Sequence, residues 1–115
     1  MKRDLDLVRE LLLALEAAET SLTVPALAGY SGELVSYHFL LLRDAGLVTL
    51  DERGPPHRRK SGYRLTWEGH ELLDAAREPH RWQKAKSLIE AAGGVTFDVL
   101  KTLLTDLAKQ TLGLS

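Results

Sequence analysis

The stretch ELVSYHFLLLRDAGLV, residues 33–48, predicts a helix that ends at a glycine and leads into a strand. Apolar side chains recur in it at the three- and four-residue spacings of one helix face. Ser31 lies just before the helix as an N-cap, and Gly46 is the natural stop because glycine readily adopts the left-handed conformation that ends many helices. The predicted buried face consists of Leu34, Val35, Phe39, Leu41, Leu42 and Ala45.

The flanking sequence predicts the order helix, turn, helix, strand, loop, strand, helix. Residues 4–19 form an amphipathic helix, after which SLTV (21–24) fits a short strand and Pro25 opens a helical turn. Residues 47–50 and 62–66 predict two strands of a β-hairpin, separated by a long loop that is rich in glycine and proline. The next helix is capped by Thr66, and its predicted inward side chains are Trp67, Leu72, Leu73 and Ala76.

Two more helices are predicted after Pro79, at residues 80–92 and 96–113. We therefore divide the chain into residues 1–78 and a C-terminal helical extension, residues 79–115. The last helix carries a long apolar stripe that must cover something. Packing within its own chain and a homodimer through Thr96–Leu112 are equally compatible with the sequence. We interpret Trp82, in the helix before it, as a packing anchor.

Composition excludes several classes of protein. The 115 residues contain no Cys, which excludes disulfides and thiolate metal sites. No apolar run approaches the length of a membrane span, and the N-terminus lacks the features of a signal peptide, so we expect a cytoplasmic protein. The four His residues show no ligand spacing, and no catalytic motif is present. We expect neither an enzyme nor a bound cofactor or metal.

The order of elements and two segments resemble known repressors. ELVSYHFLLLRDAGLV, followed at loop distance by YRLTWEG (63–69), is similar to the winged-helix repressors of the arsenic-repressor and multidrug-resistance-regulator types. This resemblance implies an α+β, mostly helical fold: a winged helix-turn-helix with a small β-hairpin wing and the C-terminal helical extension. It also implies that His38 mainly packs the recognition helix, with a DNA contact as the alternative. The segment before that helix, TVPALAGYS, is shorter than the usual positioning helix.

A wider resemblance covers nearly the whole chain, from Met1 to about Leu107. Its motifs are the opening MKRDLDLVRELLLALE, GYS, YH, RLTWEGHELLDA, a Trp followed by Lys residues, and GG before FDVLK. Together they are similar to a family of short phage and prophage proteins that is catalogued only as a domain of unknown function. The resemblance implies a winged-helix fold and a bacterial or phage setting, and it supplies no established activity.

Positive charge is concentrated in RGPPHRRKSGYR, residues 53–64. This segment holds five of the fifteen Lys and Arg residues and no Asp or Glu, in a chain with 16 acidic side chains. Such a local cluster is typical of phosphate binding, although a solvated loop tip would look the same. We favour nucleic acid. The candidate phosphate or minor-groove contacts are Arg53, His57, Arg58, Arg59, Lys60 and Arg64.

The outer stripe of the predicted recognition helix is Glu33, Ser36, Tyr37, Leu40 and Arg43. Ser36, Tyr37 and Arg43 suit phosphate or base-edge contacts, and we add Ser31 at the start of the helix. An ordinary solvated face is an equally good interpretation of this stripe. Leu40 is unusual on a helix that faces DNA. The sequence thus predicts a DNA-binding regulator of phage or prophage transcription, with a protein-interaction module on the same scaffold as the alternative.

Overall fold

The computed structural model describes residues 1–18, 26–94, 96–111 and 113. These residues form five α-helices, a short 3-10 helix and a two-stranded antiparallel sheet, so the fold is α+β and mostly helical, as predicted. The strand predicted at 21–24 and the turn predicted at Pro25 lie outside the described residues. The chain divides into two compact units, residues 1–70 and 71–115, and each is described by itself below.

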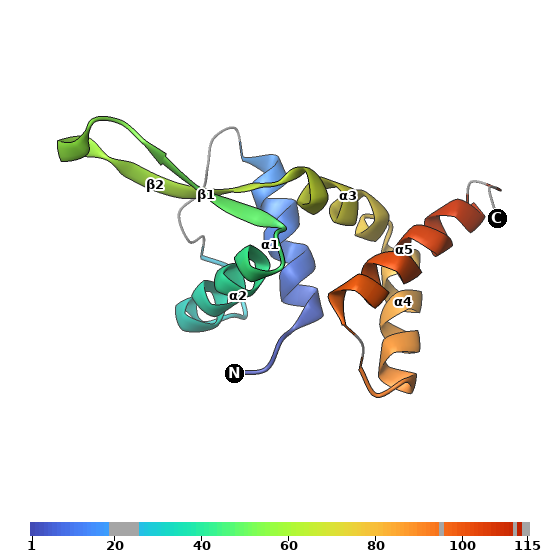
Figure 1. The fold of residues 1–115 in the computed structure, drawn as a ribbon. Helices are drawn as coiled ribbons and strands as arrows, with labels where there is room; N and C mark the ends of the chain where they lie inside the picture. Colours follow the sequence, from blue (N-terminus) through green and yellow to red (C-terminus); the bar gives the residue numbers. More distant parts are fainter. Residues whose placement is uncertain (19–25, 95, 112, 114–115) are drawn as a thin grey trace. The chain divides into compact units, whose positions relative to one another are not determined.

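Unit 1 packs two helices against a hairpin (Figure 1). In chain order it contains α1 (Leu5–Ala17), α2 (Gly32–Asp44), β1 (Val48–Arg53), the 3-10 helix η1 (Pro56–Arg58), β2 (Lys60–Leu65) and the first turn of α3 (Trp67–Ala76). The core of the unit is aliphatic around a single aromatic ring. Its buried side chains are Leu7, Val8, Leu11, Leu12, Leu15, Val35, Phe39, Leu42, Leu47, Val48 and Leu65.

His38 joins the start of α1 to the middle of α2. Its Nε2 accepts a hydrogen bond from the backbone N–H of Asp4 (2.8 Å), and its Nδ1 lies 2.9 Å from the carbonyl oxygen of Leu34. The Asp4 side chain in turn caps α1 by accepting from the N–H groups of Asp6 and Leu7. Because His38 is 0% exposed, its predicted packing role is confirmed, and the alternative of a DNA contact is wrong.

The hairpin is longer than the sequence predicted. Its ladder runs from Val48 opposite Leu65 to Arg53 opposite Lys60, so both strands extend into the segment predicted to be a loop. One side of the sheet packs on the helices, where Tyr63 stacks on Phe39 with ring centroids 4.6 Å apart. The other side and the tip face solvent, and the far half of the hairpin projects beyond α1 and α2 (Figure 1).

The base of the hairpin is held by a compact joint. Gly46 has a φ of +75°, which lets the chain reverse after α2. The hydroxyl of Thr66 donates to the carbonyl of Gly46 (2.6 Å), and its oxygen accepts from the N–H of Gly69 (3.1 Å), so the predicted cap is confirmed. A Cβ at Gly69 would overlap the carbonyl oxygen of Leu47, so only glycine lets α3 approach this closely.

Trp67 departs from the predicted inward set of α3. Leu72, Leu73 and Ala76 are buried as predicted, but Trp67 is 79% exposed. It occupies the first position of the helix, directly after the cap, where its side chain points away from the face that carries the leucines. The prediction for Trp67 is therefore wrong, since a large aromatic side chain is not by itself a sign of burial.

Unit 2 contains the rest of α3, with α4 (Pro79–Ala91) and α5 (Phe97–Thr111) packed on each other. Pro79 is the first residue of α4, one residue before the predicted start, and Trp82 is 3% exposed, which confirms it as a packing anchor. The α5 stripe lies in the unit's core through Leu100, Leu104 and Leu107. No helix in the described part of the chain is long and apolar enough to cross a membrane.

Candidate nucleic-acid interface

The predicted outer stripe of α2 is exposed. Ser36 and Arg43 face solvent, Tyr37 is half-buried and packs edge-on against the His38 ring, and Leu40 is 52% exposed. Ser31 caps the helix, with its Oγ accepting from the N–H of Leu34 (3.1 Å). Its hydroxyl hydrogen remains available to an acceptor. The structure therefore brings the α2 candidates to one surface, on which only Arg43 is cationic.

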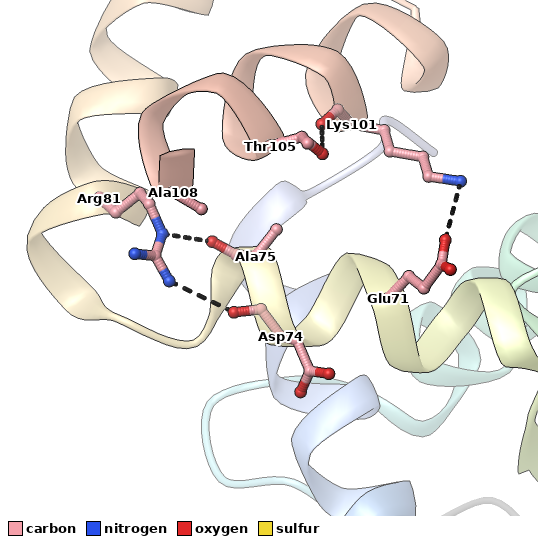
Figure 2. Close-up of a pocket in the computed structure, with 7 residues that line it drawn as sticks. All are labelled: Glu71, Asp74, Ala75, Arg81, Lys101, Thr105 and Ala108. Carbon is pink, nitrogen blue, oxygen red and sulfur yellow. Dashed lines mark hydrogen bonds and ion pairs between the residues drawn. The ribbon is translucent and has the colours of Figure 1, made fainter. Parts of the chain in front are cut away.

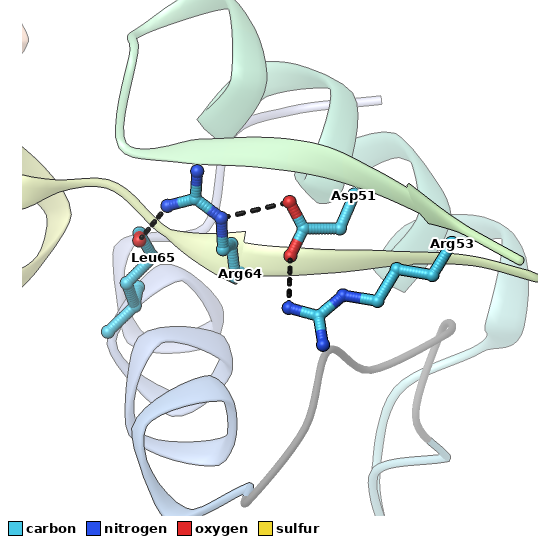
Figure 3. Close-up of polar contacts among 4 residues, drawn as sticks. All are labelled: Asp51, Arg53, Arg64 and Leu65. Atoms are coloured by element: carbon cyan, nitrogen blue, oxygen red, sulfur yellow. Dashed lines mark hydrogen bonds and ion pairs between the residues drawn. The ribbon is translucent and has the colours of Figure 1, made fainter.

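On the solvent-facing side of the hairpin, one carboxylate lies between two guanidinium groups (Figure 3). Arg64 donates from Nε to Oδ1 of Asp51 (2.9 Å) and from Nη1 to the carbonyl oxygen of Leu65 (3.4 Å). Arg53 Nη2 lies 3.5 Å from Oδ2 of the same carboxylate. We call these three residues the Asp51 triad.

The strand register explains the Asp51 triad. Side chains two residues apart lie on the same side of a strand, which places Arg53 beside Asp51 on β1. Gly62 is the cross-strand partner of Asp51 and has no side chain to intervene. Arg64, two residues further along β2, is then the diagonal neighbour that a long side chain can reach. This contact was not predicted, because the basic segment begins at residue 53, just after the two acidic residues.

A second acidic residue neutralises a cation near the tip. Arg59 Nη1 donates to Oε2 of Glu52 at 3.1 Å, and both side chains are exposed. Three of the predicted contacts, Arg53, Arg59 and Arg64, are therefore engaged in ion pairs. The Arg59–Glu52 pair is exposed on both sides and contributes about 0–1 kcal/mol, so the Arg59 guanidinium can be transferred to another anion at little cost.

The tip of the hairpin keeps an excess of positive charge. His57 and Arg58 lie in η1, directly before Arg59, and all three are exposed. Among the described residues, none forms an ion pair with Arg58. Lys60 begins β2 opposite Arg53. From residue 48 to residue 65 the sequence has five Lys or Arg against two Asp or Glu, so the hairpin as a whole is cationic.

Unit 2 offers a different kind of surface. An open depression of about 550 Å³ is lined by Glu71, Asp74, Ala75, Arg81, Lys101, Thr105 and Ala108 (Figure 2). Several of its polar groups bond to one another. Arg81 donates to the carbonyl oxygens of Ala75 (2.7 Å) and Asp74 (3.3 Å), and Lys101 pairs with Glu71 (3.7 Å). Arg81 thus satisfies carbonyls at the end of α3, a helix-capping role.

Among the described residues, no group of three or more His, Asp or Glu side chains could hold a metal ion. In unit 2 the pKa of Glu78 is lowered from its ordinary value of 4.5, mainly because the backbone N–H groups of His80 and Arg81 donate to its carboxylate. This carboxylate is the N-cap of α4. Its charge is therefore used to stabilise a helix end.

Residues 2–96 match the protein family described as "Hypothetical protein (DUF2513)". The chain belongs to the DUF2513 family. An uncharacterized protein from Haemophilus influenzae is 37% identical to this DUF2513 chain over 117 residues, which cover 97% of the chain and 99% of that protein. No solved structure matches it. The predicted membership of a family of unknown function is confirmed, and the match includes both α2 and the hairpin of the candidate interface.

Proposed function

We propose that this DUF2513 protein binds double-stranded DNA through unit 1, as a winged helix-turn-helix regulator of phage or prophage transcription. The order α1, α2, hairpin, α3 supports the winged-helix interpretation. In that arrangement α2 is the recognition helix and the hairpin is the wing. Phosphates would be held by the wing, and base edges would be read by α2.

The observation that carries the proposal is the cationic tip of the projecting hairpin. The tip extends beyond α1 and α2, so these two helices do not stand between it and an approaching duplex (Figure 1). Arg58 has no acidic partner among the described residues, and the exposed pair that holds Arg59 is weak. Two arginines, with His57 and Lys60 beside them in sequence, therefore suit backbone phosphates or the minor groove.

The outer stripe of α2 supplies the second half of the proposed interface. Ser36 and Tyr37 are hydrogen-bonding groups for base edges in the major groove, and Arg43 is a cation for the flanking phosphate. All three lie on the exposed side of the helix. Because this stripe contains few cations, we expect the hairpin to supply most of the electrostatic affinity for DNA.

Leu40 supports a second candidate function, a protein-interaction module. A leucine that is 52% exposed in the middle of the same stripe, with Glu33 about two helical turns away, is better suited to a protein surface than to phosphate. A homodimer through Thr96–Leu112 is a further possibility. Leu100, Leu104 and Leu107 are already buried within unit 2, so a dimer would use the outer side of α5, where Val99 is exposed.

The test measures binding to short duplexes of randomised sequence at salt concentrations from about 50 to 200 mM. The variant is Arg58→Ala with Arg59→Ala, and the matched control is Lys84→Ala with Lys109→Ala, which removes the same charge from exposed positions of unit 2. We expect the slope of log affinity against log salt to fall by about two units in the tip variant only, because each lost phosphate contact removes about one unit.

Two results would contradict the proposal. Wild-type protein that fails to bind duplex DNA at the lowest salt would remove DNA binding from consideration and make Leu40 the starting point of a search for a protein partner. Binding that weakens equally in the tip variant and in the control would show that affinity depends on net charge and that the hairpin tip is not the DNA-binding site.

A further inference from the structure

We propose that Asp51 acts as a built-in competitor of the DNA phosphate and so limits the sequence-independent affinity of the hairpin. The inference rests on the proposed function, because it concerns how the same hairpin engages DNA. Its basis is the Asp51 triad, in which both oxygens of one carboxylate are taken by the guanidinium groups of Arg53 and Arg64 (Figure 3).

The geometry of the Asp51 triad is that of an anion held between two arginines. Arg64 donates a hydrogen bond from Nε to one carboxylate oxygen, and Arg53 forms an ion pair through Nη2 with the other. Guanidinium groups recognise carboxylate and phosphate oxygens with the same planar donor arrangement. The carboxylate therefore occupies the position in which a phosphate oxygen could be held by the same two side chains.

Burial is distributed unevenly within the Asp51 triad. The Asp51 side chain is 17% exposed, whereas Arg53 and Arg64 are 72% and 56% exposed. The acid is thus fixed near the strands, and the outer parts of both arginines face solvent. An incoming phosphate can reach the guanidinium groups, but it must share them with a fixed negative charge a few ångströms away, or draw them off that charge.

This competition acts on phosphate contacts and leaves base contacts alone. Phosphates are the same in every sequence, so a penalty on them lowers affinity for all DNA equally. Contacts from Ser36 and Tyr37 on α2 are not affected, because these residues lie on another element. A weaker electrostatic term makes binding depend more on the groups that read sequence. The predicted result is a protein with low affinity for random DNA.

Asp51 would have the opposite effect on DNA binding if its role were to organise the two arginines. If Asp51 mainly held Arg53 and Arg64 in position for phosphate, its removal would weaken binding. The two roles therefore predict changes of opposite sign from one substitution. Asp51→Asn tests them, because it keeps the size of the side chain and removes its charge. Asp51→Ser is the second variant. It also shortens the side chain, which removes its reach toward the guanidinium groups.

The experiment measures affinity for duplexes of randomised sequence across the salt range for wild type, the two Asp51 variants and Glu10→Gln. Glu10 is exposed on α1 and loses the same charge in the same unit, so it is the matched control. We expect the Asp51 variants to bind about three- to tenfold tighter at low salt. Their salt slope should be steeper by about one to two units, because two cations become available to phosphate.

The outcomes of this experiment test the inference about Asp51 separately from the proposed DNA-binding function. Tighter binding and a steeper salt slope in the Asp51 variants, with Glu10→Gln close to wild type, support the inference. Wild-type binding that is unchanged or weakened by both Asp51 substitutions overturns the inference and leaves the proposed function standing. Absence of binding by every protein overturns the proposed function and the inference with it.

Discussion

At the scale of single residues, His38 shows how one polar side chain is accommodated in an apolar core. The ring is fully buried, and both nitrogens have partners: Nε2 accepts from the N–H of Asp4, which leaves Nδ1 to donate to the carbonyl of Leu34. This arrangement selects the neutral tautomer with the proton on Nδ1. The helix cap at Asp4 is thereby attached to α2.

Replacing His38 should therefore destabilise unit 1. We expect His38→Leu to lower the free energy of unfolding by about 1–3 kcal/mol, because the N–H of Asp4 would be left without its acceptor in a partly buried position. Urea denaturation measures the change. His57→Leu, the same substitution at the exposed hairpin tip, is the control and should leave stability within about 0.5 kcal/mol of wild type. Equal stability of the two variants would contradict the assigned role of His38.

The sequence predicted which residues of unit 1 are buried better than it predicted their polar contacts. The exposure of Leu40 followed from helix periodicity, and the packing of His38 followed from the resemblance to winged-helix repressors. The contact between Asp51 and Arg64 did not, because it depends on a strand register that only the finished hairpin defines. Trp67 shows the same limit, since size and hydrophobicity do not specify the direction in which the first residue of a helix points.

At the scale of elements, the start of α4 is stabilised by a charged cap. Pro79 provides the first helical residue, with its φ already suited to the helix. Glu78 accepts from the N–H groups of His80 (2.9 Å) and Arg81 (2.7 Å), and these bonds lower the pKa of the carboxyl group. A group whose pKa is lowered by folding stabilises the folded state when it is ionised.

The pH dependence of stability should report this cap. The contribution of Glu78 is complete above its ordinary pKa of 4.5 and is lost as the pH falls through the lower pKa of the folded state. We expect Glu78→Gln to be less stable than wild type at neutral pH and the difference to shrink as the solution is acidified below about pH 4.5. Thermal denaturation across this pH range measures it. A difference that stays constant with pH would contradict a charged cap.

Element boundaries were predicted well for helices and poorly for the hairpin. Ser31, Gly46, Thr66 and Pro79 mark helix ends in the structure as they do in the sequence. The strands were predicted too short because their outer halves contain charged residues and glycine. A strand that projects into solvent needs no alternating apolar pattern, so its length cannot be predicted from the periodicity of apolar residues.

At the scale of the whole molecule, the two tryptophans report on opposite environments. Trp67, in unit 1, is 79% exposed, and Trp82, in unit 2, is 3% exposed. Indole fluorescence responds to contact with water. One ring is therefore sensitive to solvent in the folded state, and the other becomes so only when unit 2 unfolds.

Variants with a single tryptophan should separate the two signals. We expect the Trp67→Phe protein, which retains Trp82, to emit at short wavelength, to resist quenching by acrylamide and to lose both properties on unfolding. The Trp82→Phe protein, which retains Trp67, should be quenched readily in the folded state and should change little in denaturant. Similar quenching of the two folded proteins would contradict the assigned positions of the rings.

The candidate interface combines features that the sequence predicted with others that it concealed. The cationic hairpin and the exposed side of α2 were both predicted from local pattern. Their electrostatic balance was not, because Asp51 and Glu52 lie next to the basic segment in sequence and are brought among its arginines only by strand pairing. The net charge of a segment therefore overstated the charge that the folded surface offers.

The register of the hairpin also limits how its length can change. Successive residues of a strand point to opposite sides, so one residue inserted between Val48 and Asp51 would turn Asp51 toward the side that packs on Phe39. Two residues inserted in each strand would keep both sides in place and carry the tip about 7 Å further from the helices. Lengthening should therefore proceed in paired steps, each equal to more than half the ~12 Å width of a DNA major groove.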